Sequence, residues 1–200
     1  MNDSLDFGLR GKVAIVAGGG SVGSEIGNGR AASILLADAG AKVVVTDKDE
    51  LLAKKTVEMI HKRGGEAKYI SGDLTESEKC KEVVDFAISN WGRLDILDNN
   101  IGIASKLSVV DETEENWDHI MDINLKPMFL MSKYAIPEMI KSGNGGSIVN
   151  ISSISATRPK GLTTYSASKG AVLSLSQAMA VDHGADGIRV NCILPGPVYT

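Results

Sequence analysis

The sequence predicts an α/β fold built on a doubly wound, mostly parallel sheet. Short apolar runs alternate with longer amphipathic segments, a glycine-rich loop follows the first run, and polar residues stand at the ends of later runs. Short apolar runs are typical of buried strands, and the longer periodic segments are typical of helices. Repeated strand–helix units favour a parallel sheet with helices on both faces.

The expected elements follow the chain in regular alternation. The expected strands cover residues 13–16, 42–46, 67–70, 94–97, 147–151 and 188–191. The expected helices cover residues 30–39, 50–63 and 76–91, a long segment from about 112 to 141, and a segment that contains Tyr165. No linker, repeat or low-complexity segment interrupts this order, so we expect residues 1–200 to form one domain.

Composition and charge argue against several classes of protein. The chain has 21 Lys and Arg residues, 25 Asp and Glu residues and no basic run, which argues against a nucleic-acid partner. No apolar run approaches the roughly 18 residues of a membrane span, and the polar first residues do not form a signal peptide. Cys80 and Cys192 are isolated, which indicates a reducing compartment, and we expect a cytoplasmic protein. The histidines show no metal-ligand spacing, so no metal is expected.

The glycine-rich loop after the first expected strand is a candidate phosphate-binding loop. Gly18-x-Gly20-x-x-Gly23 fits the ordinary dinucleotide fingerprint. A helix that began at Gly23 would, however, contain Gly27 and Gly29, and each would cost about 1 kcal/mol relative to alanine. We therefore interpret Gly18, Gly27 and Gly29 as the functional glycines of a lengthened loop, with the helix beginning at Gly29. A flexible surface loop is the alternative interpretation.

Asp47 ends the second expected strand. A carboxylate at this position accepts hydrogen bonds from a ribose 2′-OH and repels a 2′-phosphate, which favours NAD over NADP. The neighbouring Lys48 weakens this preference, and a simple turn aspartate is the alternative.

Tyr165 and Lys169 are four residues apart, so on a helix they share one face, with Cβ atoms about 5–6 Å apart. A cation about 4 Å from the phenol, at an effective dielectric constant of about 20, is worth roughly 4 kcal/mol. Such an interaction lowers a tyrosine pKa by up to about three units, into the range useful for general acid–base catalysis. Alone, the spacing also fits an ordinary pair on a helix surface.

In this order, the residues resemble the short-chain dehydrogenase/reductase family, from about Lys12 to Thr200. Besides the glycine loop and Asp47, the resemblance rests on Asp73-Leu74, Asn99-Asn100-Ile101-Gly102, Asn124, Ser153, Tyr165-x-x-x-Lys169, and Pro195-Gly196 with Thr200. It implies a Rossmann-like, three-layer α/β/α fold with strand order 3-2-1-4-5-6.

The resemblance also implies a role for each matching residue. Tyr165 would exchange a proton with the substrate oxygen, Lys169 would assist it and hold the nicotinamide ribose, Ser153 would orient the substrate oxygen, and Asn124 would support a proton relay. Ser152 competes with Ser153 for the serine role. The expected cofactor-binding residues are Gly18, Gly27, Gly29, Asp47, Asp73, Leu74, Asn100, Tyr165, Lys169, Pro195, Val198 and Thr200.

The function that the resemblance implies is an NAD-dependent oxidoreductase that interconverts a secondary alcohol and a ketone, as a homodimer or homotetramer. A catalytically inactive dinucleotide-binding or scaffolding protein, and an NAD-retaining sugar epimerase or dehydratase, are the alternatives. The family pattern continues beyond Thr200, so the chain is either a fragment or a shortened member.

Asp98 departs from the family pattern, because a buried aliphatic residue is usual at this point of the fourth strand. A buried carboxylate costs several kcal/mol unless it is hydrogen-bonded or protonated. We expect amides or hydroxyls of the following loop to satisfy it.

Overall fold

The computed structural model of the chain describes residues 7–22, 26–143 and 145–197. Its centre is a six-stranded sheet in the order β3-β2-β1-β4-β5-β6, in which every neighbouring pair is parallel. The strands are β1 (Val13–Ala17), β2 (Lys42–Asp47), β3 (Glu66–Ser71), β4 (Ile96–Asn99), β5 (Gly146–Ile151) and β6 (Ile188–Ile193). The predicted fold class and strand order are confirmed.

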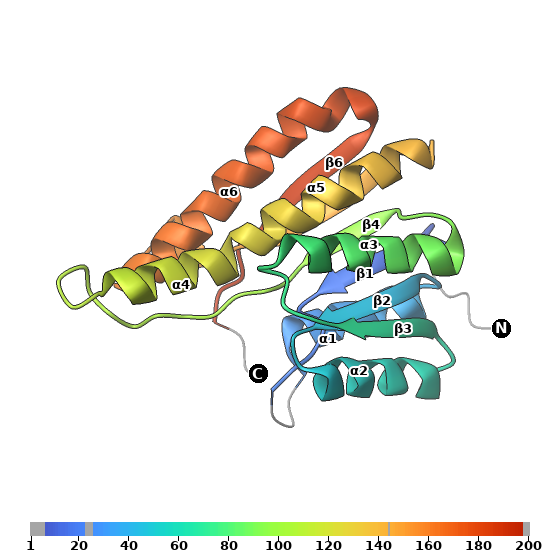
Figure 1. Cartoon of the computed structure of the whole chain (residues 1–200), viewed down its shortest axis with the longest axis horizontal. Helices are drawn as coiled ribbons and strands as arrows, with labels where there is room; N and C mark the ends of the chain where they lie inside the picture. The colour runs from blue at the N-terminus through green and yellow to red at the C-terminus, as the bar shows by residue number, and fades with distance from the viewer. Residues whose placement is uncertain (1–6, 23–25, 144, 198–200) are drawn as a thin grey trace.

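Helices cover both faces of the sheet (Figure 1). The α-helices are α1 (Asn28–Asp38), α2 (Glu50–Lys62), α3 (Ser77–Trp91), α4 (Glu114–Asn124), α5 (Lys126–Lys141) and α6 (Thr163–His183). Two short 3₁₀ helices, η1 (Ile154–Ala156) and η2 (Gly184–Asp186), flank α6. The helices α1 and α2 pack on one face, and α3, α5 and α6 lie on the other (Figure 1).

Each face of the sheet carries its own apolar core, and β1 contributes to both. All five residues of β1 are buried, as expected for the central strand of a parallel sheet. Val13 and Ile15 pack with α3 and α5, while Val16 packs with α1 and α2. Alternation along the strand therefore joins the two cores through the sheet.

A buried polar chain joins β4, β5 and α6. The Asn99 side chain donates to Oδ1 of Asn150 over 2.8 Å, and Asn150 Nδ2 donates to Ser176 Oγ over 2.9 Å. Ser176 in turn donates to the backbone oxygen of Val172. Because buried amides are costly unless hydrogen-bonded, this chain fixes how α6 lies against the sheet.

The strand β6 is one edge of the sheet, and among the described residues only one of its faces is packed. Ile188 and Val190 pack against the core on the α5 side, whereas Arg189, Asn191 and Ile193 are exposed. Ile193 keeps 51 % of its surface accessible. Buried or half-buried residues therefore alternate with exposed residues along β6, as expected for an edge strand that is covered on one face.

Two elements differ from the sequence prediction by more than a shift of their ends. The predicted fourth strand at 94–97 is wrong in position, since Leu94 is buried before pairing begins and β4 runs from Ile96 to Asn99. The expected long helix at 112–141 is interrupted at Leu125, which ends α4 and precedes α5. Pro127, at the start of α5, lacks the backbone N–H that a continuous helix would use there.

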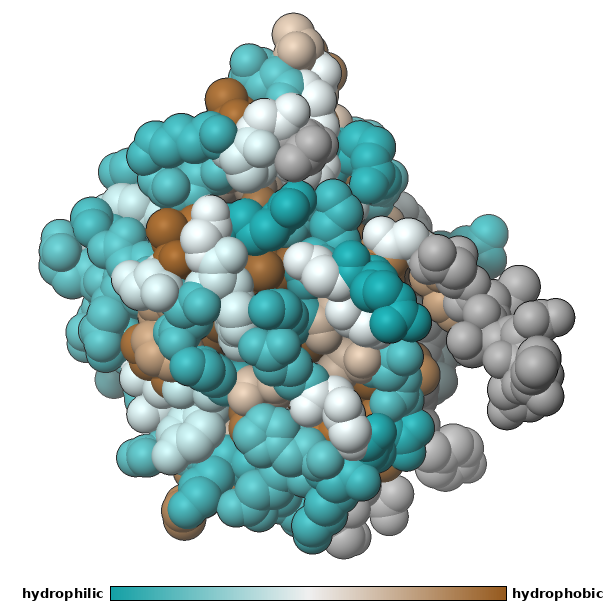
Figure 2. All heavy atoms as spheres, turned by 90° about the vertical axis from the view of Figure 1, so that its right-hand side faces the viewer, coloured by the Kyte–Doolittle hydropathy of each residue, from teal (hydrophilic) through white to brown (hydrophobic). Residues whose placement is uncertain are grey.

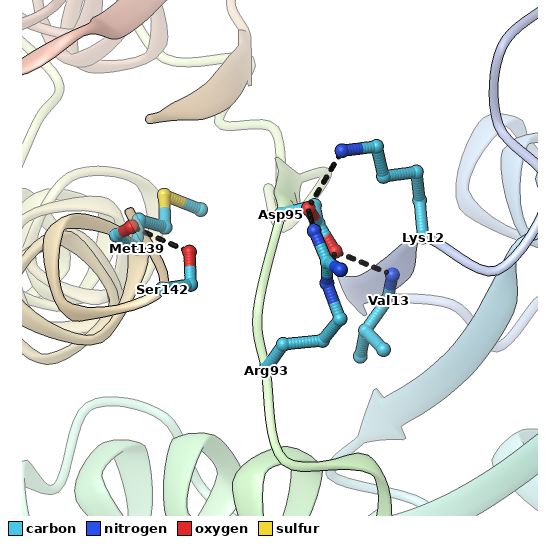
Figure 3. Close-up of polar contacts among 6 residues, drawn as sticks. All are labelled: Lys12, Val13, Arg93, Asp95, Met139 and Ser142. Atoms are coloured by element: carbon cyan, nitrogen blue, oxygen red, sulfur yellow. Dashed lines mark hydrogen bonds and ion pairs between the residues drawn. The ribbon is translucent and has the colours of Figure 1, made fainter. Parts of the chain in front are cut away.

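A buried carboxylate joins the amino ends of β1 and β4. Asp95 accepts hydrogen bonds from the backbone N–H of Val13 and from the side chains of Lys12 and Arg93 (Figure 3). Burial alone would raise the pKa of Asp95, but these hydrogen bonds outweigh burial and hold it below its ordinary value. The side of the molecule shown in Figure 2 is largely hydrophilic, with apolar residues scattered among the polar ones.

Asp98 is a second buried carboxylate, and it lies inside β4. Both of its oxygens accept from the side-chain amide of Asn100, at 3.1 and 2.9 Å. The expected loop amide is therefore present. Burial still dominates and raises the pKa of Asp98 to about 6.

Asp98 makes the stability of the fold depend on pH. The folded-state pKa of about 6 lies above the unfolded value of about 3.9, so the folded chain binds more protons between these two values. Stability from this group is therefore lost as pH rises through that window. We expect Asp98→Asn to raise the free energy of unfolding at pH 8 by roughly 2 kcal/mol more than at pH 4, measured by urea denaturation. An equal change at both pH values, or the same pH dependence in exposed Asp118→Asn, would contradict this assignment.

Candidate active site

A cleft of about 760 Å³ lies along the carboxyl ends of the strands. This volume is within the range of small-molecule and cofactor sites, about 300–1,000 Å³. Most of the predicted site residues line the cleft. They are Gly18, Gly27, Gly29, Asp47, Asp73, Leu74, Asn100, Ser153, Tyr165, Lys169 and Pro195.

The other three predicted residues lie elsewhere or outside the described structure. Asn124 is fully buried behind the cleft, and it is absent from the lining. Val198 and Thr200 lie outside the described residues.

The glycine loop brings the backbone close to the start of α1. Gly27 is the N-cap residue of α1, and Gly18 has a left-handed φ of 81°. A Cβ on Gly29 would stand 2.0 Å from the backbone oxygen of Gly18, so only glycine fits there. The helix begins at Asn28, one residue before the predicted start, which places Gly29 inside its first turn.

Gly20 is a cleft residue that the sequence interpretation set aside. Its backbone N–H donates to Oδ2 of Asp47 over 3.0 Å, and a Cβ on Gly20 would meet that oxygen at 2.5 Å. The other Asp47 oxygen accepts from the backbone N–H of Asp49 at 3.1 Å. These contacts orient the carboxylate at one end of the cleft. The Gly18-x-Gly20 spacing was the available signal.

Lys48 and Asp73 form an ion pair beside Asp47, with Nζ and Oδ2 2.6 Å apart. The hydrogen bond from Lys48 and those from Thr75 lower the pKa of Asp73 to about 2. Lys48 is largely exposed, so this pair lies at the mouth of the cleft rather than beneath it. The positive charge of Lys48 is therefore paired with the carboxylate of Asp73.

A buried polar cluster holds the glycine loop from behind. Arg30, almost fully buried in α1, donates from Nε to Thr56 Oγ1 over 2.9 Å and from an Nη to the backbone oxygen of Ser21. Thr56 in turn donates to the backbone oxygen of Gly19 over 2.8 Å. Burial lowers the pKa of Arg30, and the charge of nearby Asp47 partly offsets this. Sequence patterns do not indicate this cluster, because it joins α1 to α2.

Lys169 and Tyr165 line the other end of the cleft. Lys169 is buried, and its ammonium donates to the backbone oxygen of Ile151 over 2.9 Å. Its Nζ lies 5.9 Å from the centre of the Tyr165 ring. Burial lowers the pKa of Lys169 to about 8, and the nearby Cys192 thiol partly offsets this. At neutral pH the amine is therefore mostly protonated.

Gly102 makes room for this ammonium. A Cβ on Gly102 would stand 2.8 Å from Nζ of Lys169. Glycine at this point of the loop after β4 therefore lets the lysine reach the cleft.

The two candidate serines use their hydroxyls differently. Ser152 donates its proton to the backbone oxygen of Lys169 over 2.7 Å. Ser153 instead accepts from the backbone N–H of Ser155 over 3.2 Å, at the start of η1. The Ser153 proton has no acceptor among the hydrogen bonds of the described residues.

Asn124 holds the loop after β4 against α6. Its side chain accepts from the N–H of Ile103 over 2.7 Å and donates to the oxygen of Ile103 over 2.9 Å. It also donates to Ser168 Oγ over 2.9 Å. The side chain thus bonds across elements and not to a carbonyl of its own helix. The helix α4 ends at Asn124 itself.

In the described ranges, no group of three or more His, Cys, Asp and Glu side chains is arranged to hold a metal ion. None of the helices described is both long and apolar enough to cross a bilayer.

Comparisons with known proteins agree with this fold. The family model described as short chain dehydrogenase matches residues 12–200. An oxidoreductase from Thermotoga maritima is 42 % identical over 192 residues, which cover 94 % of this chain and 72 % of that protein. The 2,5-dichloro-2,5-cyclohexadiene-1,4-diol dehydrogenase of Sphingobium indicum is 39 % identical, over 96 % of this chain and 75 % of that one.

The fold is also similar to a solved structure of a short-chain dehydrogenase/reductase from Burkholderia xenovorans. The TM-score is 0.92 and the identity 36 %, over 96 % of this chain and 76 % of that one. With a family model matched over nearly its whole length and relatives at this level of identity, the chain belongs to the short-chain dehydrogenase family of oxidoreductases.

Proposed function

We propose that the chain is an NAD-dependent oxidoreductase that interconverts a secondary alcohol and a ketone. One observation supports this proposal: Ser153, Tyr165 and Lys169 line the same glycine-lined cleft as Asp47. The first three are proton-transfer and orienting groups, and Asp47 is a ribose acceptor. We propose that the two sets act on the two ends of one dinucleotide.

The residues of the cleft fit a dinucleotide. Side chains at Gly20, Gly29 or Gly102 would collide with Asp47, Gly18 or Lys169, so bare backbone lines the cleft at three points. Backbone N–H groups at the start of α1 suit a pyrophosphate, because a helix N-terminus attracts negative charge. When bound, the nicotinamide ring supplies the acceptor or donor of hydride.

Tyr165 is the group that we propose to take a proton from the alcohol oxygen or give one to the ketone oxygen. Lys169, protonated at neutral pH, stabilises the negative charge that develops on these oxygens during transfer. Its hydrogen bond to Ile151 fixes the ammonium position before substrate arrives. Asn124, which holds Ile103 and Ser168, supports the proton relay by keeping this end of the cleft in place.

Ser153 is the better candidate for orienting the substrate oxygen. Its hydroxyl oxygen accepts a backbone hydrogen bond, which leaves its proton available to a substrate. The Ser152 proton is engaged by the backbone oxygen of Lys169, so Ser152 supports α6 instead.

Asp47 favours NAD as the cofactor. Gly20 and Asp49 hold its carboxylate at the cleft, where a 2′-phosphate would meet negative charge. Lys48, the cation nearest in sequence, is paired with Asp73, so its charge is compensated there. For NADP to bind well, this pair would have to separate.

A cyclic secondary alcohol is the substrate class that we favour. The Sphingobium relative is named for a cyclic diol, and here Ile103, Leu107 and Ile154 leave apolar surface partly exposed in the segments that follow β4 and β5. Of these three, Ile103 lines the cleft, and an apolar wall with a few polar groups suits a small ring that carries one hydroxyl.

Homo-oligomer formation stays a prediction. Trp117 on α4 and Phe129 on α5 leave 39 % and 48 % of their surfaces exposed, which supports an interface on these helices.

Turnover of an alcohol tests the function directly. We expect the purified chain with NAD to oxidise at least one member of a panel of cyclic and acyclic secondary alcohols, followed by the absorbance of reduced nicotinamide. Binding of NAD without turnover, in a chain extended to the length of its relatives, would instead support a catalytically inactive dinucleotide-binding protein. Tightly retained NAD with isomerised or dehydrated sugars as products would support the epimerase or dehydratase.

Removing the Tyr165 hydroxyl tests its proton transfer. We expect Tyr165→Phe to lower kcat by about 10²–10⁴-fold, since general acid–base catalysis contributes about that much, with NAD affinity within twofold of the unaltered chain. The matched control is Tyr69→Phe, which removes a phenol hydroxyl on β3, away from the cleft lining. Activity near the unaltered value in Tyr165→Phe would refute the assignment.

Removing the Asp47 charge tests cofactor choice. We expect Asp47→Ala to shift the ratio of kcat/KM values toward NADP by about tenfold or more, equivalent to at least about 1.4 kcal/mol. Glu50→Gln removes a neighbouring exposed charge and serves as the control. An unchanged ratio in Asp47→Ala would remove the basis for choosing NAD.

A further inference from the structure

The first turn of α6, which carries Tyr165, lacks the usual local stabilisation. Its N-cap residue is Leu162, which makes no side-chain capping bond, and the first turn has no acidic residue. Leu162 has a φ of 58°, the one positive φ outside glycine in the described residues. This conformation is strained for a leucine, so contacts from other elements must hold the turn.

Glu112 supplies such a contact from the loop that joins β4 to α4, residues 100–113. Its Oε2 accepts a short hydrogen bond from Thr164 Oγ1, and Thr164 directly precedes Tyr165. Thr164 is completely buried, so its hydroxyl needs this partner. A carboxylate beside the first turn of a helix also interacts favourably with the helix dipole.

The same carboxylate holds its own loop in shape. Its Oε2 also accepts from Ser105 Oγ over 3.0 Å, and its Oε1 accepts from Asn116 Nδ2 over 2.6 Å. Ser105 is buried and lies two residues after Ile103, which lines the cleft. Glu112 therefore joins one wall of the cleft to the first turn of α6.

A backbone bond reinforces this connection. The N–H of Thr163 donates to the backbone oxygen of Leu107 over 3.2 Å. The loop and the helix thus meet at two consecutive residues, Thr163 and Thr164. The side-chain hydrogen bonds that Glu112 accepts from Thr164, Asn116 and Ser105 lower its pKa, the one from Thr164 most.

We propose that Glu112 is a positioning residue for Tyr165, fastening the loop between β4 and α4 to the first turn of α6 through Thr164. This proposal rests on the proposed function, because it assumes that Tyr165 carries out the proton transfer. Misplacing a reacting group by about 1 Å costs about 10²-fold in rate. We call the hydrogen bonds of Glu112 to Thr164 and to its own loop the clamp. Loss of the clamp therefore lowers the rate of the chemical step and leaves the distant contacts of Asp47 and the glycine loop intact.

Three substitutions and one control test the clamp. Glu112→Gln keeps the side-chain size but replaces an acceptor oxygen by a donor, Thr164→Val removes the buried hydroxyl at constant shape, and Thr164→Ser retains it. Exposed Glu115→Gln removes a charge from the same region and is the control. We expect Glu112→Gln and Thr164→Val to lower kcat by about 10- to 100-fold, with KM for NAD within twofold. Thr164→Ser and Glu115→Gln should stay within threefold of the unaltered chain in kcat.

A measurement independent of turnover separates this proposal from the proposed function. Amide hydrogen exchange of residues 163–168 and 103–108 should become at least tenfold faster in Glu112→Gln and Thr164→Val, and stay unchanged in Thr164→Ser. If the unaltered chain oxidises no alcohol, the proposed function fails while the exchange data still test the clamp. Unchanged exchange in Glu112→Gln, or a Thr164→Ser variant as slow as Thr164→Val, would overturn the proposal.

Discussion

Parallel pairing of all six strands is the constraint on which the site depends, because it brings every carboxyl end to the same edge. The register aligns Ala17 with Asn99 and Asn99 with Asn150. The residues that follow these strands, Gly18, Asn100 and Ser153 among them, therefore meet at one cleft although they are far apart in the sequence. No individual motif could assemble this site, since each supplies only one side of it.

The same constraint explains how much of the molecule could be predicted. Short runs of β-branched residues predict the approximate positions of the strands. Such runs indicate that a segment is buried, but not which of its residues pair with a neighbouring strand. Leu94 is buried and apolar, yet the ladder with β1 begins two residues later, so the predicted fourth strand begins too early in the chain. The break at Leu125 was hidden because apolar spacing continues through it, although Pro127 was a usable signal for a new helix start.

Contacts between elements were the part of the site that no local pattern could indicate. Glycines and Asp47 were recognisable because their role follows from position relative to a strand. The bond from Arg30 to Thr56 joins residues 26 apart, and the bond from Thr164 to Glu112 joins residues 52 apart. Neither pair has a characteristic spacing, since tertiary packing alone brings its members together. These hydrogen bonds between elements hold the predicted site residues in position. A sequence pattern therefore indicates a site residue more readily than the residues that position it.

Lys169 shows why a costly group can be retained at this edge. Within the described residues no carboxylate lies within ion-pair distance of its ammonium, and burial lowers its pKa to about 8. A carboxylate partner would offset the desolvation cost, but it would also neutralise the field that the ammonium exerts on neighbouring oxygens. In a site with little water, that field acts through a lower effective dielectric and is stronger than at the surface. The backbone oxygen of Ile151 holds the ammonium in place by a hydrogen bond. Because this oxygen carries no net charge, the positive charge of Lys169 is not neutralised and can act on groups in the cleft.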